Sequence, residues 1–258
     1  MLSGIDLAIS GVISGNNNGF QKDGAGTLEL TGANTYSGNT TVAAGRLLVD
    51  GAGVIAGTVG VNSGAVLGGN GTVKGAVTIN AGGTLAPGSD NSIGTLTLGN
   101  NLALSGNTRV KLNKGLAQSN DVVNVSGTLT YGGTLTVVNL GSTLVAGDSF
   151  QIFKPGGTGG MTVSGDAGSG LGFSFADGVV SVVATGPSGP SVITNSVSGN
   201  ILSLSWPAGQ GWKLQMQTNS LATGLGTNWV YVTDGTLSST NVTIDQTKST
   251  VFYRLVYP

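Results

Sequence analysis

A glycine followed by a short apolar run returns at nearly constant spacing along the first third of the chain. Three such segments are AAGRLLV (43–49), NSGAVLG (62–68) and NAGGTLAPG (80–88). Their glycines, Gly45, Gly64 and Gly82, lie 19 and 18 residues apart. A sequence that repeats with a period of about 20 residues is typical of a solenoid, in which each repeat packs only against its neighbours.

Short stretches with alternating apolar residues lie between and beyond these glycines. They are GTVGV (57–61), GTVKGAVTI (71–79) and GTLTLGNNLALSG (94–106). The alternation has the period of two that is typical of β-strands, and no helical period competes with it. Strand–turn–strand units stacked in register about 4.8 Å apart form a parallel β-helix, and residues 2–185 would supply about nine or ten coils, a rod on the order of 45 Å long.

The low charge of the chain agrees with stacked coils. Only 8% of the 258 residues are charged, and glycine accounts for 47. Because equal positions of successive coils lie over one another, like charges would repel, whereas Thr and Asn ladders can form hydrogen bonds. Corners of the coil need backbone conformations that Gly and Asn adopt at little cost, which accounts for the glycine content.

Charge and composition also exclude several partners. The formal net charge is −1, with no long run of either sign, so we expect neither a nucleic acid nor an anionic membrane surface as partner. No stretch approaches the roughly 18 apolar residues of a transmembrane helix, so we expect no membrane insertion. The chain has neither Cys nor His, which excludes disulfides, a Cys or His in a catalytic triad and most transition-metal sites.

One segment carries a resemblance to a known family. GAGTLELTGANTYSGNTTVAAGRLLV (24–49) resembles the autotransporter-associated β-strand repeat, also called the passenger-associated transport repeat. Residues 62–88 are similar to the right-handed parallel β-helix of bacterial autotransporter passengers, and 7–28 to the end of one repeat that runs into the next. The resemblance covers about the first 185 residues. It implies a secreted, extracellular or cell-surface rod that serves as a stalk or passenger.

A change of composition predicts a domain boundary. The stretch TGPSGPS (185–191) contains two prolines and two glycines, as linkers do. We therefore expect a β-helix over 1–185, a Gly/Pro/Ser linker over 186–191 and a second domain over 192–258. The predicted fold class is all-β, a right-handed parallel β-helix (solenoid) followed by a small antiparallel β-sandwich.

The last part of the chain alternates clearly between apolar and polar residues. Five strands are predicted, at ILSLSW (201–206), WKLQMQ (212–217), NWVYV (228–232), NVTI (241–244) and VFYRLVY (251–257). This pattern is similar to an immunoglobulin or fibronectin type III module. All three tryptophans and three of the five tyrosines lie here: Trp206, Trp212, Trp229, Tyr231, Tyr253 and Tyr257.

These aromatic residues have two interpretations. The favoured one is that they form the core of a small domain, because they occupy alternating positions on one face of their strands. The other is that Trp229 and Tyr231 point outward as a platform for sugar rings. Trp229 and Tyr231 share one face of their strand, and Val230 and Val232 share the other. If the strand is half-exposed, one of these two pairs points away from the core of the domain.

The inventory of catalytic groups is small. There are eleven acidic residues, with Glu29 the only glutamate, and no two are adjacent or two positions apart, as a catalytic pair on a strand would be. Asp148 and Asp166 could bridge a Ca²⁺ ion between coils, but we interpret them as turn residues after glycine. We expect no catalytic residue, no cofactor and no metal ion.

A second group of charged residues also has two interpretations. Asp121 with Arg109, Lys111 and Lys114 could form the acid–base cluster of a polysaccharide lyase. A solvated face with alternating cations is the favoured interpretation.

The sequence therefore predicts an extracellular structural protein without catalytic activity. The N-terminal stretch MLSGIDLAISGVISG is apolar, with Asp6 as its one charge, and an uncovered coil exposes unpaired strand edges. Further repeats of a longer precursor would cover it, or a second copy would, so that rods assemble head to tail into a homopolymeric fibre or form a surface stalk. The alternative is an adhesin whose second domain binds extracellular polysaccharide or a cell surface; a polysaccharide-cleaving enzyme is the least favoured.

Overall fold

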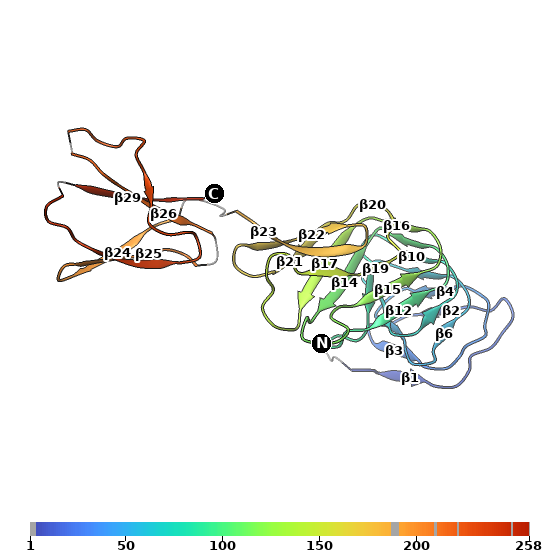
Figure 1. Cartoon of the computed structure of the whole chain (residues 1–258). Coiled ribbons are helices and arrows are strands. Elements are labelled where there is room, and N and C mark those ends of the chain that lie inside the picture. Colours follow the sequence, from blue (N-terminus) through green and yellow to red (C-terminus); the bar gives the residue numbers. More distant parts are fainter. Residues whose placement is uncertain (1–3, 187–190, 209–210, 221, 249, 258) are drawn as a thin grey trace. The chain divides into compact units, whose positions relative to one another are not determined.

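The computed structural model describes residues 4–186, 191–208, 211–220, 222–248 and 250–257 (Figure 1). All regular secondary structure in these residues is β-strand. The chain forms two compact units: the first contains the residues up to Ala167 and 172–183, and the second contains 168–171 and the residues from Ala184 on. Most of the predicted linker, 187–190, lies outside the described residues.

Three parallel sheets form the first unit. The eight-stranded sheet has the order β1 (Leu7–Ile9), β3 (Thr27–Leu30), β5 (Arg46–Val49), β8 (Val66–Gly69), β11 (Thr84–Pro87), β14 (Asn107–Leu112), β17 (Thr134–Asn139) and β21 (Thr162–Gly165). The seven-stranded sheet has the order β2 (Phe20–Lys22), β4 (Thr40–Val42), β7 (Val59–Val61), β10 (Val77–Ile79), β13 (Leu102–Leu104), β16 (Leu129–Tyr131) and β20 (Thr158–Gly159). The five-stranded sheet has the order β19 (Phe153–Lys154), β15 (Val122–Val125), β12 (Thr95–Leu98), β9 (Thr72–Val73) and β6 (Val54–Ile55).

The chain passes from sheet to sheet and returns one coil later to pair in parallel with itself (Figure 1). This is a parallel β-helix, so the predicted fold of the first unit is confirmed. The eight-stranded sheet falls short of the nine or ten coils expected because the later coils are longer. Paired residues Leu67 and Leu85 are 18 positions apart, whereas Leu135 and Val163 are 28 apart.

Inward side chains at equal positions form continuous columns. One column of the eight-stranded sheet consists of Leu7, Leu28, Leu47, Leu67, Leu85, Thr108, Leu135 and Val163. A column of the seven-stranded sheet starts with Lys22, Val42, Val61, Ile79 and Leu104 and continues with Tyr131 and Gly159. Leu47, Leu67, Leu85 and Leu135 are fully buried. Each buried leucine contributes about 1.5–3 kcal/mol relative to an exposed one, so these columns supply much of the stability.

The recurring glycines lie at the corners of the coil. Gly45, Gly64 and Gly82 have φ angles of 67°, 78° and 79°, which are costly for any residue with a Cβ atom. At Gly45 a Cβ atom would also lie 2.3 Å from the carbonyl oxygen of Gly24 in the preceding coil. The glycine repeat in the sequence therefore follows from the backbone conformation of each corner.

An antiparallel element lies at the last coil. β18 (Ser149–Gln151), β23 (Val179–Ala184) and β22 (Leu171–Ala176) form a three-stranded sheet in that order. We call β22 and β23 the end hairpin; Asp177 and Gly178 join them with positive φ angles of 49° and 81°.

The end hairpin packs against the inner columns of the β-helix. The ring of Phe175 meets Tyr131 edge to face with ring centroids 5.0 Å apart, and Phe153 with centroids 6.1 Å apart. At Gly165, a Cβ atom would lie 3.1 Å from the Phe173 ring. Rings of the end hairpin thus cover apolar positions that a further coil would otherwise cover.

The opposite end of the coil has a different arrangement. Lys22 heads its inward column and is only 8% exposed, yet its Nζ donates hydrogen bonds to the carbonyl oxygens of Asp23, Gly24 and Ala44 at 2.9, 2.8 and 3.1 Å. The ammonium group is therefore fully satisfied by backbone. In the neighbouring sheet β1 is the edge strand, and Leu7 at the end of the leucine column is 57% exposed.

Two three-stranded antiparallel sheets form the second unit. One has the order β24 (Thr194–Ser198), β25 (Ile201–Ser205) and β28 (Ser239–Thr243), and the other β27 (Val230–Tyr231), β26 (Lys213–Thr218) and β29 (Val251–Val256). Both contribute to one core around Leu204, Trp206, Trp212 and Leu214. The predicted antiparallel second domain is confirmed, and its likeness to fibronectin type III stays a prediction.

Candidate functional site

The aromatic residues of the second unit fall into two groups. Trp206 and Trp212 are buried, with 6% and 9% of their surface exposed, and belong to the core. Tyr231 is 59% exposed, and Trp229 is half-buried. The core interpretation therefore describes Trp206 and Trp212 but not the pair that was predicted as a platform.

Trp229 and Tyr231 lie on the side of their sheet that faces away from the core. Their neighbour Val232 packs against the core, as does Leu214 on the adjacent strand β26. Gln215 pairs with Tyr231 on one side and with Arg254 on the other. Since alternate residues of a strand point to opposite faces, the face opposite the core carries Lys213, Gln215, Trp229, Tyr231 and Arg254, and we call it the aromatic–cationic face.

Each aromatic ring of this face has a cation beside it. The guanidinium carbon of Arg254 lies 4.1 Å from the centroid of the Trp229 ring. Arg254 Nε also donates a hydrogen bond of 2.9 Å to Oε1 of Gln215. Lys213 Nζ lies 5.6 Å from the centroid of the Tyr231 ring. Such contacts contribute about 0.5–1 kcal/mol each at exposed sites, so they orient both cations over the rings.

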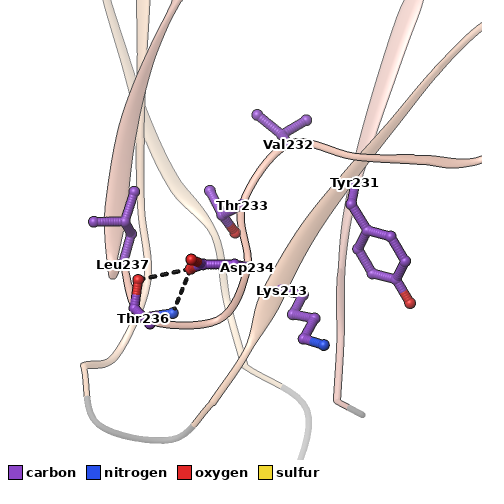
Figure 2. Close-up of a pocket in the computed structure, with 7 residues that line it drawn as sticks. All are labelled: Lys213, Tyr231, Val232, Thr233, Asp234, Thr236 and Leu237. Carbon is purple, nitrogen blue, oxygen red and sulfur yellow. Dashed lines mark hydrogen bonds between the residues drawn. The ribbon is translucent and has the colours of Figure 1, made fainter.

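A shallow pocket of about 580 Å³ adjoins the face (Figure 2). Its lining consists of Lys213, Tyr231, Val232, Thr233, Asp234, Thr236 and Leu237. Figure 2 shows the Lys213 side chain between the Tyr231 ring and the turn of Asp234 and Thr236. The Asp234 carboxylate accepts hydrogen bonds from Oγ1 and N of Thr236, at 2.6 and 2.9 Å. These bonds, with a smaller effect of the Lys213 charge, hold the pKa of that carboxyl below its usual value.

The interpretation of Lys111 and Asp121 as part of a solvated face is wrong. Both side chains are fully buried, and Lys111 Nζ lies 2.7 Å from Oδ2 of Asp121. The cause is that the loop after β14 brings Asp121 back to this strand. Gly94 N donates a hydrogen bond to Asp121 Oδ1 and Lys111 N donates one to Oδ2, while Pro87 O, at the end of the neighbouring strand β11, accepts a hydrogen bond of 2.6 Å from Lys111 Nζ. Burial raises the pKa of Asp121 and lowers the pKa of Lys111, while their mutual attraction opposes both shifts.

The other charged candidates are paired as well. Arg109 lies 4.0 Å from Asp90, which also binds Arg46. Lys114 Nζ donates to Oδ2 of Asp148 at 2.8 Å, so this acid, suggested with Asp166 as a Ca²⁺ ligand, has a lysine beside it. In the part of the chain that the structure describes, no three His, Cys, Asp or Glu side chains cluster as a metal site would require.

The residues that the structure describes contain no helix that is long and apolar enough to span a bilayer.

The segment 20–49 builds two consecutive windings of the β-helix. Strand β2 pairs with β4, and β3 pairs with β5. Between them Tyr36 is buried, its ring meets Phe20 edge to face at 5.5 Å, and its hydroxyl is 2.8 Å from Oγ1 of Thr40.

Residues 20–49 match the family model of the passenger-associated-transport-repeat. The chain carries this repeat. The match confirms the resemblance that residues 24–49 show in the sequence, and no curated protein matches the chain. The passenger-associated-transport-repeat indicates a β-helical surface protein of the passenger type, at a secreted or surface location.

Sequence reasoning missed Lys213 and Arg254 as members of the candidate site. Their partners Tyr231 and Trp229 lie in another part of the chain, and the pairing register that brings these residues together cannot be predicted from a local sequence pattern. The alternation in VFYRLVY does place Arg254 on the strand face opposite to Tyr253 and Leu255, and this pattern could have predicted that Arg254 points away from the core.

Proposed function

We propose that the chain is a non-catalytic structural protein of the cell exterior, a β-helical stalk that carries the second unit. The continuous apolar columns of the first unit support this role, because each coil is stabilised by its two neighbours and needs no ligand. The paired state of Lys111, Asp121, Lys114 and Asp148 also supports it, since these were the groups available for acid–base chemistry.

A stalk is favoured over a head-to-tail fibre by the end hairpin. An open-ended polymer needs a heterologous contact, in which the edge of one end meets the complementary edge of the other. The edge strand β1 with its exposed Leu7 offers such a surface at one end. At the other end Phe175 covers Tyr131 and Phe153, and the exposed edge strand β21 presents Thr162, Ser164 and Gly165 instead of large apolar side chains. A contact through β1 alone would join at most two copies.

The oligomeric state tests the stalk against the fibre. We expect light scattering after size exclusion to give a monomer, or a dimer at high concentration, and electron microscopy to show no filaments. Filaments that lengthen with protein concentration would overturn the stalk proposal in favour of the fibre. The control is Leu7→Lys, which places a charge on the exposed apolar edge strand β1 and should abolish any dimer while leaving the monomer folded.

The absence of catalysis is tested separately. We expect no new reducing ends and no unsaturated sugar products after long incubation with a panel of neutral and acidic polysaccharides. Turnover that disappears in an Asp90→Asn variant, which alters the most exposed acid of the ion pairs, would overturn this part of the proposal.

A binding role for the second unit is the second candidate function. The observation that favours it is the 59% exposure of Tyr231 on a sheet face that also holds Trp229. Exposed aromatic rings beside polar groups are common in binding surfaces. Such an adhesin would bind a glycan or another surface.

A further inference from the structure

The positive charges of the second unit are unevenly placed. Residues 192–258 contain three cationic side chains, and two of them, Lys213 and Arg254, lie on the aromatic–cationic face. The third, Lys248, is exposed in the segment between β28 and β29. A sheet of three short strands thus gathers most of the positive charge of its unit beside two aromatic rings.

These two cations lack the carboxylate partners that four of the seven cations of the first unit have. Arg46, Arg109, Lys111 and Lys114 each lie within 4.0 Å of a carboxylate. Among the described residues, neither Lys213 nor Arg254 forms such an ion pair. Their closest contacts are with Tyr231, Trp229 and the uncharged Gln215. Asp234 lines the same pocket as Lys213 and feels its charge without forming an ion pair with it, so both cations are oriented and neither is bound to a carboxylate.

We propose that the aromatic–cationic face binds an acidic polysaccharide, one whose sugar units carry carboxylates. Arg254 and Lys213 would pair with successive carboxylates, and the open ring of Tyr231 would stack against the apolar face of a sugar between them. The adjoining pocket also contains the carboxylate of Asp234, so the acidic groups of the polymer would lie on the Arg254 side of Lys213 and not in this pocket.

The two cations lie beside different rings of one strand. Arg254 is over Trp229 and Lys213 is beside Tyr231, and these rings are two residues apart along the chain, roughly 7 Å. A polymer that follows this strand can therefore place successive acidic units beside both cations, with the Tyr231 ring within reach of a sugar.

Charge complementarity favours an acidic over a neutral polysaccharide. A neutral glycan would leave two oriented charges without partners and would need mainly the stacking surface of Tyr231. An acidic one gains charge-assisted contacts that salt screens, because the face is exposed. Salt dependence is therefore the signature that separates the two classes.

The test uses the full chain and polygalacturonate, with a neutral glucan of similar length as the comparison. Calorimetry at low salt should show binding of polygalacturonate that weakens at least tenfold in 0.5 M sodium chloride, and little binding of the glucan. Lys213→Gln, Arg254→Gln and Tyr231→Ala should each weaken binding about tenfold. Lys248→Gln removes the same charge elsewhere in the unit and should leave the affinity unchanged.

Three outcomes would overturn the proposal: no binding of polygalacturonate, equal binding of the glucan, or equal losses in the Lys248→Gln and Lys213→Gln variants. Near-ultraviolet circular dichroism of each variant shows whether the tryptophan core is intact. Arg254→Lys provides a second check if Arg254→Gln fails to fold, since it keeps the charge and should retain most of the affinity. Binding is independent of the stalk role, so light scattering on the same preparations separates the failure of one from that of the other.

Discussion

Thr108 is the one polar side chain in a column of leucines and valine. It is fully buried between Leu85 and Leu135, and its hydroxyl has no hydrogen-bond partner. A buried hydroxyl without a partner costs on the order of 1–3 kcal/mol. We expect Thr108→Val, which keeps the shape and removes the hydroxyl, to raise the free energy of unfolding by about 1 kcal/mol in urea titrations.

The control for this substitution is Thr78→Val, on the exposed side of strand β10. The same change of side chain should there alter the free energy of unfolding by less than about 0.5 kcal/mol. If both variants are stabilised equally, strand propensity and not the buried hydroxyl is the cause.

The buried pair of Lys111 and Asp121 makes a sharper prediction. In Lys111→Met the Asp121 carboxylate stays buried without its cation, and we expect a loss of about 3–5 kcal/mol at pH 7. Adding Asp121→Asn removes the unpaired charge, so the double variant should be more stable than Lys111→Met alone. Urea unfolding of both single variants and the double variant completes the cycle.

The same pair predicts a dependence on pH. Without Lys111, burial holds the pKa of Asp121 in the folded protein above the ordinary value of 3.8, so the folded state takes up a proton that the unfolded state does not. The stability of Lys111→Met should therefore fall as pH rises from the ordinary value through that folded pKa, and part of it should be regained when the pH is lowered from 7 toward 4. A stability difference from the double variant that stays constant between these pH values would contradict this account.

At the scale of single residues, the sequence predicted what the backbone requires. Gly45, Gly64 and Gly82 were recognised because the positive φ angle at each corner favours glycine, and these glycines recur in the sequence at a nearly constant spacing. Lys22 and Lys111 were not, because a lysine on a strand looks the same whether solvent, three carbonyl oxygens or a carboxylate surrounds its ammonium group. Which of these applies depends on how the chain turns after the strand: at Lys22 the next two residues fold back over the ammonium group, and at Lys111 a loop returns Asp121 to the strand.

At the scale of elements, alternation predicted the strands well and their ends less well. The stretch 94–106 was expected to form short strands, and it contains β12 and β13. The end hairpin escaped prediction, since Leu171–Ala176 and Val179–Ala184 alternate as a further coil would. What distinguishes them is the tight connection through Asp177 and Gly178, whose positive φ angles turn the chain back on itself.

The end hairpin is expected to stabilise the β-helix through Phe175. Phe175→Ala removes two edge-to-face contacts, with Tyr131 and Phe153, and leaves their rings more exposed. Because Phe175 is only half-buried, we expect a loss of about 2 kcal/mol rather than the 3–5 kcal/mol of a core phenylalanine. Thermal and urea unfolding measure the change.

The matched control is Ser174→Ala, one position earlier on the exposed side of β22. It should leave the stability within about 0.5 kcal/mol of the parent. The Phe175→Ala variant should also associate more at high concentration, because it uncovers the end of the coil. A Phe175→Ala variant as stable and as monomeric as the parent would argue against a covering role.

At the scale of the whole molecule, the β-helix behaves as a set of interchangeable coils. Residues that pair between β7 and β10 are 18 positions apart in the sequence, as Val59 and Val77 are. The eight-stranded sheet has the same spacing between the paired residues Leu67 and Leu85. Removing residues 57–74 deletes one coil and joins two that are in the same register. We expect this variant to fold to a β-helix with one strand fewer per sheet, as judged by far-ultraviolet circular dichroism and a cooperative thermal transition.

A deletion out of register is the control for the coil deletion. Removing residues 57–65 takes out half of a coil and shifts every later inward side chain relative to the columns, so this variant should not fold cooperatively. If the two deletions are equally tolerated, the columns do not determine the fold of the first unit. Failure of the in-register deletion alone would mean that this coil has a role beyond stacking.

The last coil is shaped for the hairpin that covers it. Gly165 follows Val137 in an inner column, and a Cβ atom there would lie 3.1 Å from the Phe173 ring of the end hairpin. A leucine at this position would therefore collide with that ring. A β-helix of this kind could be lengthened or shortened only by moving the glycine together with the hairpin, so that the ring always meets a coil without a side chain beneath it.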